Sequence, residues 1–137
     1  MKAFSLILLA GLVYAQTGNT FKARLTTVAL DATMRATVAG SGSAAATLNG
    51  SRLTVTGTFE GLKSRATTAQ IHRGVATGVR GPAILDLSVL SNATSGTIGG
   101  SFDLTADQLA GLRKGQLYIQ IQSEKAPEGN LWGWLLQ

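Results

Sequence analysis

Cysteine is absent from the 137-residue sequence, which excludes disulfide bonds and thiolate metal sites. Histidine occurs once, at His72, and the seven acidic residues show no spacing that singles out a pair. The sequence therefore contains no complete set of residues for nucleophilic, general acid–base or metal-assisted catalysis, and we expect neither an enzyme nor a cofactor. Without crosslinks, the fold must rest on its own apolar core, which a chain of this length is large enough to bury.

Long hydrophobic runs are also missing, except for the ten residues from Phe4 to Val13. A helix that crosses a bilayer needs ~20 apolar residues. The run follows the positive Lys2 and precedes Val13-Tyr14-Ala15, a pattern typical of a signal peptide cleaved after Ala15. We expect residues 1–15 to be removed and residues 16–137 to form a single domain, secreted or periplasmic, with no remaining membrane span. The alternative is an uncleaved N-terminal anchor.

Charge is scarce and unclustered, since Lys, Arg, Asp and Glu make up only 14% of the chain. The net charge of +5 comes from basic residues dispersed along the sequence. Nucleic-acid-binding proteins usually gather such residues on one stripe, so no nucleic-acid partner is predicted. Long-range attraction to an anionic cell-surface polymer stays open.

The region after residue 16 is rich in Thr, Val, Ile, Leu and Gly, arranged in short runs with a period of two. Such alternation predicts β-strands with one face toward the core. In the run 53–59, Leu53, Val55 and Phe59 share one face, and Asn49-Gly50 before it is a strong hairpin signal. The predicted strands are 21–28, 34–38, 45–48, 53–59, 66–72, 83–90, 97–102, 117–122 and 131–136.

One helix interrupts the strands, predicted near residues 105–114. Thr105 and Gln108 have the spacing of a capping box, and Gly115 suits a left-handed stop. Asp103 and Asp107 flank the helix start, where the dipole favours negative charge, so we interpret them as structural. The glycine-rich stretch 72–82 lacks the ending of a phosphate loop and is interpreted as a long structural loop. Nine strands and one helix predict an all-β sandwich or barrel.

Polar and aromatic residues alternate onto shared faces of three predicted strands. If these strands are neighbours, the groups form one surface suited to stacking on sugar rings or gripping a protein. In the alternative interpretation, the two tryptophans cover the open end of the core. The residues of this predicted surface are Gln70 and His72, Tyr118, Gln120 and Gln122, and Trp132 and Trp134.

Several motifs together resemble the CHRD domain, a module named after chordin and also found in exported bacterial proteins. The resemblance implies a Greek-key β-sandwich similar to the copper/zinc superoxide dismutase fold, in a domain without an established enzymatic activity. The motifs are Phe21-Lys22-Ala23-Arg24-Leu25, Ala69-Gln70-Ile71-His72 with Gly74 and Gly81-Pro82, Gly100-Ser101-Phe102-Asp103-Leu104-Thr105, 115–121, and 127–135.

The departures from the family pattern bear on metal binding. The family typically has three histidines where this chain has Gln70, His72 and Gln122, and amides are poor ligands for metals that favour imidazole. We therefore expect no metal site. An acid and an arginine of the family's closing motif are replaced by Asn130 and Trp132, which predicts stacking or apolar contact at that edge in place of ion pairing.

The sequence thus predicts a non-enzymatic, exported binding or scaffold module that acts on a protein or a cell-surface polysaccharide. Its binding residues would be those of the polar and aromatic face defined above. Two alternatives remain. One is a degenerate copper- or zinc-binding protein of dismutase-like fold that uses His72. The other is a self-associating extracellular structural subunit, a homo-oligomer whose edge strands pair between chains.

Overall fold

The computed structural model of the chain describes residues 18–28, 32–90 and 93–137. The predicted signal peptide and its cleavage point lie outside these ranges. Within them, no helix combines the length and the hydropathy that crossing a bilayer requires. The predicted single domain begins before the described residues, at residue 16.

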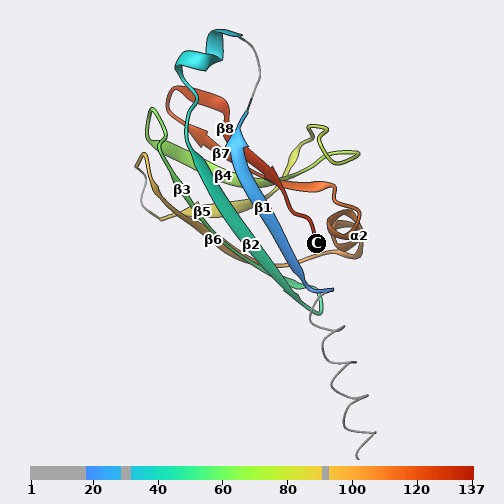
Figure 1. Cartoon of the computed structure of the whole chain (residues 1–137). Helices are drawn as coiled ribbons and strands as arrows, with labels where there is room; N and C mark the ends of the chain where they lie inside the picture. The colour runs from blue at the N-terminus through green and yellow to red at the C-terminus, as the bar shows by residue number, and fades with distance from the viewer. Residues whose placement is uncertain (1–17, 29–31, 91–92) are drawn as a thin grey trace, which may run out of the picture.

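In the described residues, eight antiparallel strands close into a barrel in the order β1-β2-β3-β6-β5-β4-β7-β8 (Figure 1). The all-β prediction is confirmed. The strands are β1 (Thr20–Thr27), β2 (Ser41–Asn49), β3 (Arg52–Glu60), β4 (Ala66–Arg73), β5 (Ala83–Val89), β6 (Gly96–Asp103), β7 (Leu117–Ser123) and β8 (Ala126–Trp134), joined by the 3-10 helix η1 (Ala32–Ala36) and by α2 (Ala106–Arg113).

The structure shows a closed ring, one of the two architectures that the strand pattern predicted, whereas the family resemblance implied a sandwich of two layers. Two short seams close it. At one, β5 meets β6 through Ser88–Gly99 and Val89–Ile98. At the other, β1 meets β8 through Thr26–Trp132 and Thr27–Leu131. Both seams join strands whose other neighbours are paired over longer registers, so they hold two broad sheets together as one ring.

The barrel interior is built by the predicted alternation. Along β3, Leu53, Val55 and Phe59 are buried while the three threonines between them are exposed. Along β7, Leu117, Ile119 and Ile121 are buried in the same core, as their spacing predicts. Packing these aliphatic side chains against one another removes apolar surface from water and stabilises the fold.

The helix is also as predicted. Gln108 N–H donates to Thr105 Oγ1, and Thr105 N–H donates to Gln108 Oε1, so both halves of the capping box are formed. The helix ends before Gly115, whose φ of 73° lies in the left-handed region.

The predicted strand at 34–38 is wrong, and the described residues contain one strand fewer than the nine expected. Residues 32–36 form η1, in which no side chain is buried. Thr37 N–H and Val38 N–H both donate to the Met34 carbonyl, which closes a helical turn. With no apolar face to bury here, local hydrogen bonding decides the conformation.

The prediction for the edge with Asn130 and Trp132 holds in part: Trp132 makes aromatic contacts, whereas the Asn130 amide makes hydrogen bonds. The side chain is fully buried. Its Nδ2 donates to the Ala39 carbonyl at 3.0 Å, and Ala39 N–H donates to its Oδ1 at 3.4 Å. The amide therefore pairs with the backbone that leads into β2, as a neighbouring strand would.

Asn130→Ala is expected to lower the free energy of unfolding by about 2 kcal/mol, since a buried amide is removed and both polar groups of the half-buried Ala39 lose their partner. Urea unfolding measures this. Gln137→Ala is the matched control, because this amide is exposed, and its removal should cost less than about 0.5 kcal/mol. Equal costs for the two variants would contradict the structural role of Asn130.

Candidate functional site

The structure brings all seven residues of the predicted surface to one face of neighbouring strands. β7 lies between β4 and β8, so the condition that the strands be neighbours is met. The side chains point away from the barrel interior, because the alternate residues of each strand fill the core. Across the strands the rows are Gln70–Gln120–Trp132, His72–Tyr118–Trp134, and Thr68–Gln122.

Tyr118 is the centre of an aromatic cluster. Its ring stacks on His72 with centroids 5.0 Å apart, and it meets Trp134 at 4.4 Å and Trp132 at 5.9 Å. The two indoles contact each other edge-on at 6.1 Å. Offset and edge-to-face contacts of this kind add to the stability gained from burial, so the cluster holds both indoles in fixed orientations.

Burial divides the predicted surface into two groups. Tyr118, Gln120 and His72 are 1%, 3% and 9% exposed, so a macromolecular partner cannot rest on them. Trp132 and Trp134 are half-buried and keep part of their surface in solvent. The prediction that all seven residues contact a ligand therefore needs correction. The three buried residues lie beneath the surface and support the side chains that reach solvent.

The two remaining amides lie at the margins of this face, half-buried and already hydrogen-bonded. Gln70 Nε2 donates to Asp86 Oδ1 on β5 at 3.0 Å, and Thr68 Oγ1 donates to Gln122 Oε1. These contacts orient the amides along the sheet. A ligand that binds Gln70 or Gln122 would use the hydrogen-bonding capacity that these contacts leave open.

The loop 74–82 is hydrogen-bonded to two of the buried side chains, Tyr118 and His72. Tyr118 Oη donates to the Gly81 carbonyl at 3.0 Å, and Gly81 N–H donates to the same hydroxyl at 3.0 Å. His72 Nδ1 lies 2.9 Å from the Gly81 carbonyl. A carbonyl only accepts, so Nδ1 carries a proton, and Nε2 is buried and without a hydrogen-bond partner among the described residues.

The same loop adds a residue that the sequence did not indicate. The Arg80 guanidinium carbon lies 5.3 Å from the centroid of the Trp132 ring, within cation–π range. Arg80 therefore flanks the aromatic face and places a positive charge beside the indoles. Nothing in the spacing of Arg80 predicts this contact, since it depends on how the loop folds back over β7.

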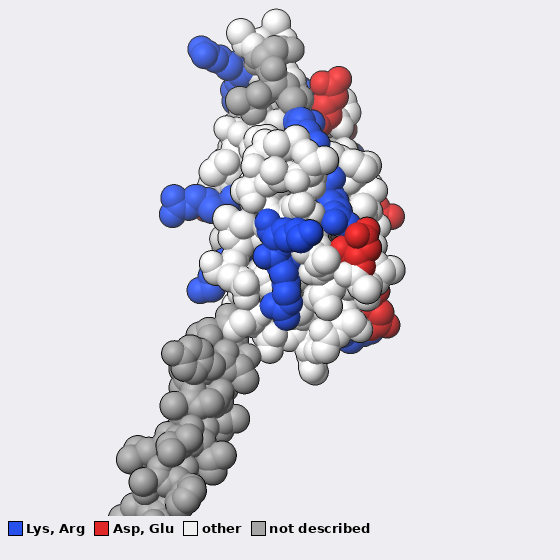
Figure 2. All heavy atoms as spheres, turned by 90° about the vertical axis from the view of Figure 1, so that its right-hand side faces the viewer, with Lys and Arg blue, Asp and Glu red and all other residues white. Residues whose placement is uncertain are grey.

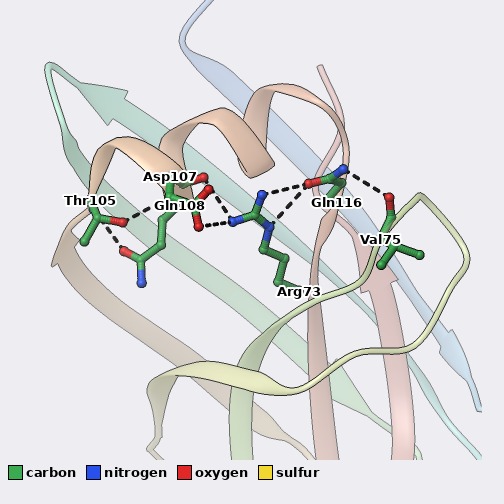
Figure 3. A network of polar contacts seen from close by, with 6 residues as sticks. All are labelled: Arg73, Val75, Thr105, Asp107, Gln108 and Gln116. Carbon is green, nitrogen blue, oxygen red and sulfur yellow. Dashed lines mark hydrogen bonds and ion pairs between the residues drawn. The ribbon is translucent and has the colours of Figure 1, made fainter.

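Arg73, at the end of β4, ties the base of the loop to the helix (Figure 3). Its Nη1 donates to Asp107 Oδ2 at 2.7 Å, and its Nη2 donates to Gln116 Oε1 at 3.1 Å. Gln116 Nε2 in turn donates to the Val75 carbonyl at 3.1 Å. Gly111 makes room for Arg73, because a Cβ there would lie 2.7 Å from its Nε. Asp107, at the helix start, is thus the ion-pair partner of Arg73.

Comparison with protein families agrees with these motifs. The model of the CHRD domain matches residues 21–135. The chain belongs to the CHRD domain family. No curated protein and no solved structure matches it. The match runs from β1 to the residue after β8, so the CHRD domain comprises the whole barrel.

The three positions at which the family resemblance implies histidines do not all lie together in this CHRD domain. Gln122 lies opposite Thr68, which precedes His72 by four residues on β4 and so lies about 13 Å from it along the strand. Gln70 faces Gln120 and binds Asp86. Among the described residues, no group of three His, Cys, Asp or Glu side chains lies close enough together to hold a metal ion.

Proposed function

We propose that this CHRD domain is a non-enzymatic, exported binding module that holds a cell-surface polysaccharide on the outward face of β4, β7 and β8. The observation that carries the proposal is the pair of half-buried indoles fixed over the buried Tyr118. Flat apolar rings beside amides match the apolar faces and hydroxyl groups of sugars. Because the rings are held in place before binding, little conformational entropy is lost on contact.

Each residue of this face then has its own role in polysaccharide binding. Trp132 and Trp134 contact the sugar rings, and Gln70 and Gln122 at the margins bind hydroxyl groups. Tyr118, His72 and Gln120 are positioning residues that support the indoles. Arg80 favours a polymer that carries negative charge.

The alternatives have weaker support. Pairing of edge strands between chains would have to open one of the two seams, since the ring otherwise leaves no long free edge in the described residues. A copper or zinc protein would depend on one imidazole whose Nδ1 is already bound to the Gly81 carbonyl.

The strand order contains two crossovers, from β3 to β4 and from β6 to β7, which supports the predicted Greek-key relation to the superoxide dismutase fold.

Intrinsic fluorescence provides a direct test, because Trp132 and Trp134 are the only tryptophans in the sequence. Titration with purified envelope polysaccharide should change the emission. Trp132→Ala and Trp134→Ala should each weaken binding roughly tenfold or more, as expected for aromatic residues that dominate an interface. Thr56→Ala, on an exposed position of β3, is the control and should bind as the parent does.

Unchanged affinity in both tryptophan variants, with unfolding midpoints close to the parent, would contradict the site. If immobilised secreted proteins are bound and polysaccharide is not, the ligand class is wrong. A loss of that protein binding in the tryptophan variants would then still support the face.

A further inference from the structure

Exposed apolar side chains gather on a second face, beside the loop 74–82. In the described residues four large hydrophobic side chains are exposed: Val75 at 81%, Val79 at 44%, Leu90 at 73% and Leu136 at 44%. Val75 and Val79 belong to this loop, and Leu136 lies close to its middle. Thr77, between the two valines, donates from Oγ1 to the Gly115 carbonyl at 2.6 Å, and a Cβ on Gly115 would lie 3.0 Å from Leu136 Cδ2.

The loop stands out from the barrel wall next to α2 (Figure 1), yet it is tied at several points. Gly74 N–H donates to the Gln116 carbonyl at 2.9 Å, and Val79 N–H donates to the Ala76 carbonyl at 3.1 Å. The Val75 carbonyl accepts from Gln116, as described above. The backbone is therefore fixed in a conformation that keeps both valine side chains in water, which costs free energy unless something covers them.

Positive charge surrounds these side chains. Arg80 belongs to the loop, and Arg113 and Lys114 lie at the end of α2, where a shallow groove of about 270 Å³ is lined by Thr77, Lys114 and Leu136. None of these three cations forms an ion pair with a described carboxylate. The acidic Asp107 on the same helix is already paired with Arg73. On this side of the molecule basic side chains cross the middle and acidic ones lie along one flank (Figure 2).

We propose that this face, formed by Val75, Val79, Leu136, Arg80, Arg113 and Lys114, docks on an anionic lipid bilayer. The valines enter the boundary between headgroups and acyl chains while the cations bind lipid phosphates. A protruding loop tip needs no shaped pocket in its partner, and a bilayer accepts apolar side chains at any point. A bilayer therefore fits this geometry better than a protein groove. The face shares Arg80 with the proposed polysaccharide site but none of that site's other residues. The variants that test it leave Arg80 in place, so the proposal does not depend on polysaccharide binding.

Sedimentation of the exported protein with vesicles of phosphatidylcholine, with and without phosphatidylglycerol, tests this. Binding should require phosphatidylglycerol and fall with added salt. Arg113→Gln with Lys114→Gln should weaken it by roughly twenty-five-fold, at about fivefold per charge near the surface. Val75→Ser with Val79→Ser should weaken it by roughly tenfold, from lost apolar burial.

The chain offers matched controls away from this face. Leu90→Ser removes an exposed apolar side chain, and Arg35→Gln with Lys63→Gln removes two exposed charges at η1. Both should leave vesicle binding unchanged. All variants should keep the parent's unfolding midpoint and its polysaccharide affinity, so that failure here is distinguishable from failure of the polysaccharide site.

Three results would overturn the proposal. Equal binding to vesicles without phosphatidylglycerol would exclude the role of lipid charge. Weakening by the charge variant alone, with none from the valine variant, would show surface adsorption without insertion. Equal weakening by Leu90→Ser would show that the effect is not specific to this face.

Discussion

Gly81→Ala is expected to lower the free energy of unfolding by about 3–5 kcal/mol, because several buried polar groups would lose their partner at once. A Cβ on Gly81 would lie 1.7 Å from the Arg73 carbonyl oxygen, which belongs to the backbone and cannot turn away. The loop must therefore move. Tyr118 Oη and His72 Nδ1 both depend on the Gly81 carbonyl and would be left without it.

Urea unfolding measures this loss, and tryptophan emission should shift because Arg80 moves away from Trp132. Gly18→Ala is the matched control, since nothing lies within 4 Å of a Cβ at that position. It should change stability by less than about 0.5 kcal/mol. A Gly81→Ala protein as stable as the Gly18→Ala protein would show that the loop is not held as described.

Tyr118→Ala is expected to cost about 3–5 kcal/mol, the usual cost of removing a buried aromatic ring. The side chain is 1% exposed and contacts His72, Trp132 and Trp134. Tyr118→Phe keeps the ring and loses only the hydroxyl that joins Gly81, so it should cost about 1–2 kcal/mol. The comparison separates packing from hydrogen bonding.

Near-ultraviolet circular dichroism should report the change directly, because Tyr118→Ala removes the ring that orients both indoles. Tyr118→Phe should retain most of the signal and most of the affinity for polysaccharide. If Tyr118→Ala costs no more than Tyr118→Phe, the ring does not organise the cluster, and the proposed binding face loses its support.

Gly81 and Tyr118 show how an outward face of a barrel becomes rigid. Ordinarily the outer side of a β-strand faces water, and its side chains sample several rotamers. Here the loop 74–82 is hydrogen-bonded to two such side chains, Tyr118 and His72, and leaves two indoles at the margin. The aromatic face is therefore prepared before a ligand arrives, which is what a binding module requires.

Local patterns predicted the elements well. The alternation of Leu53, Val55 and Phe59 placed them in the core, and the Thr105 and Gln108 pair placed the helix start within one residue. They failed at residues 34–38, where a short run of mixed residues has no buried face and forms η1. Alternation of residue types predicts a strand only where one face of the segment can be buried in a core, and this segment has no such face.

The sequence by itself determined that this is an all-β CHRD domain without disulfides, and that seven polar and aromatic side chains share faces of three strands. Only the tertiary structure decided that the strands close into a ring, that Tyr118, His72 and Gln120 are buried, and that Arg80 flanks Trp132. The physical reason is separation along the chain. Side-chain alternation is local and visible in the sequence, whereas the loop that covers β7 and the seams that close the barrel join residues far apart, and their positions depend on packing of the whole domain.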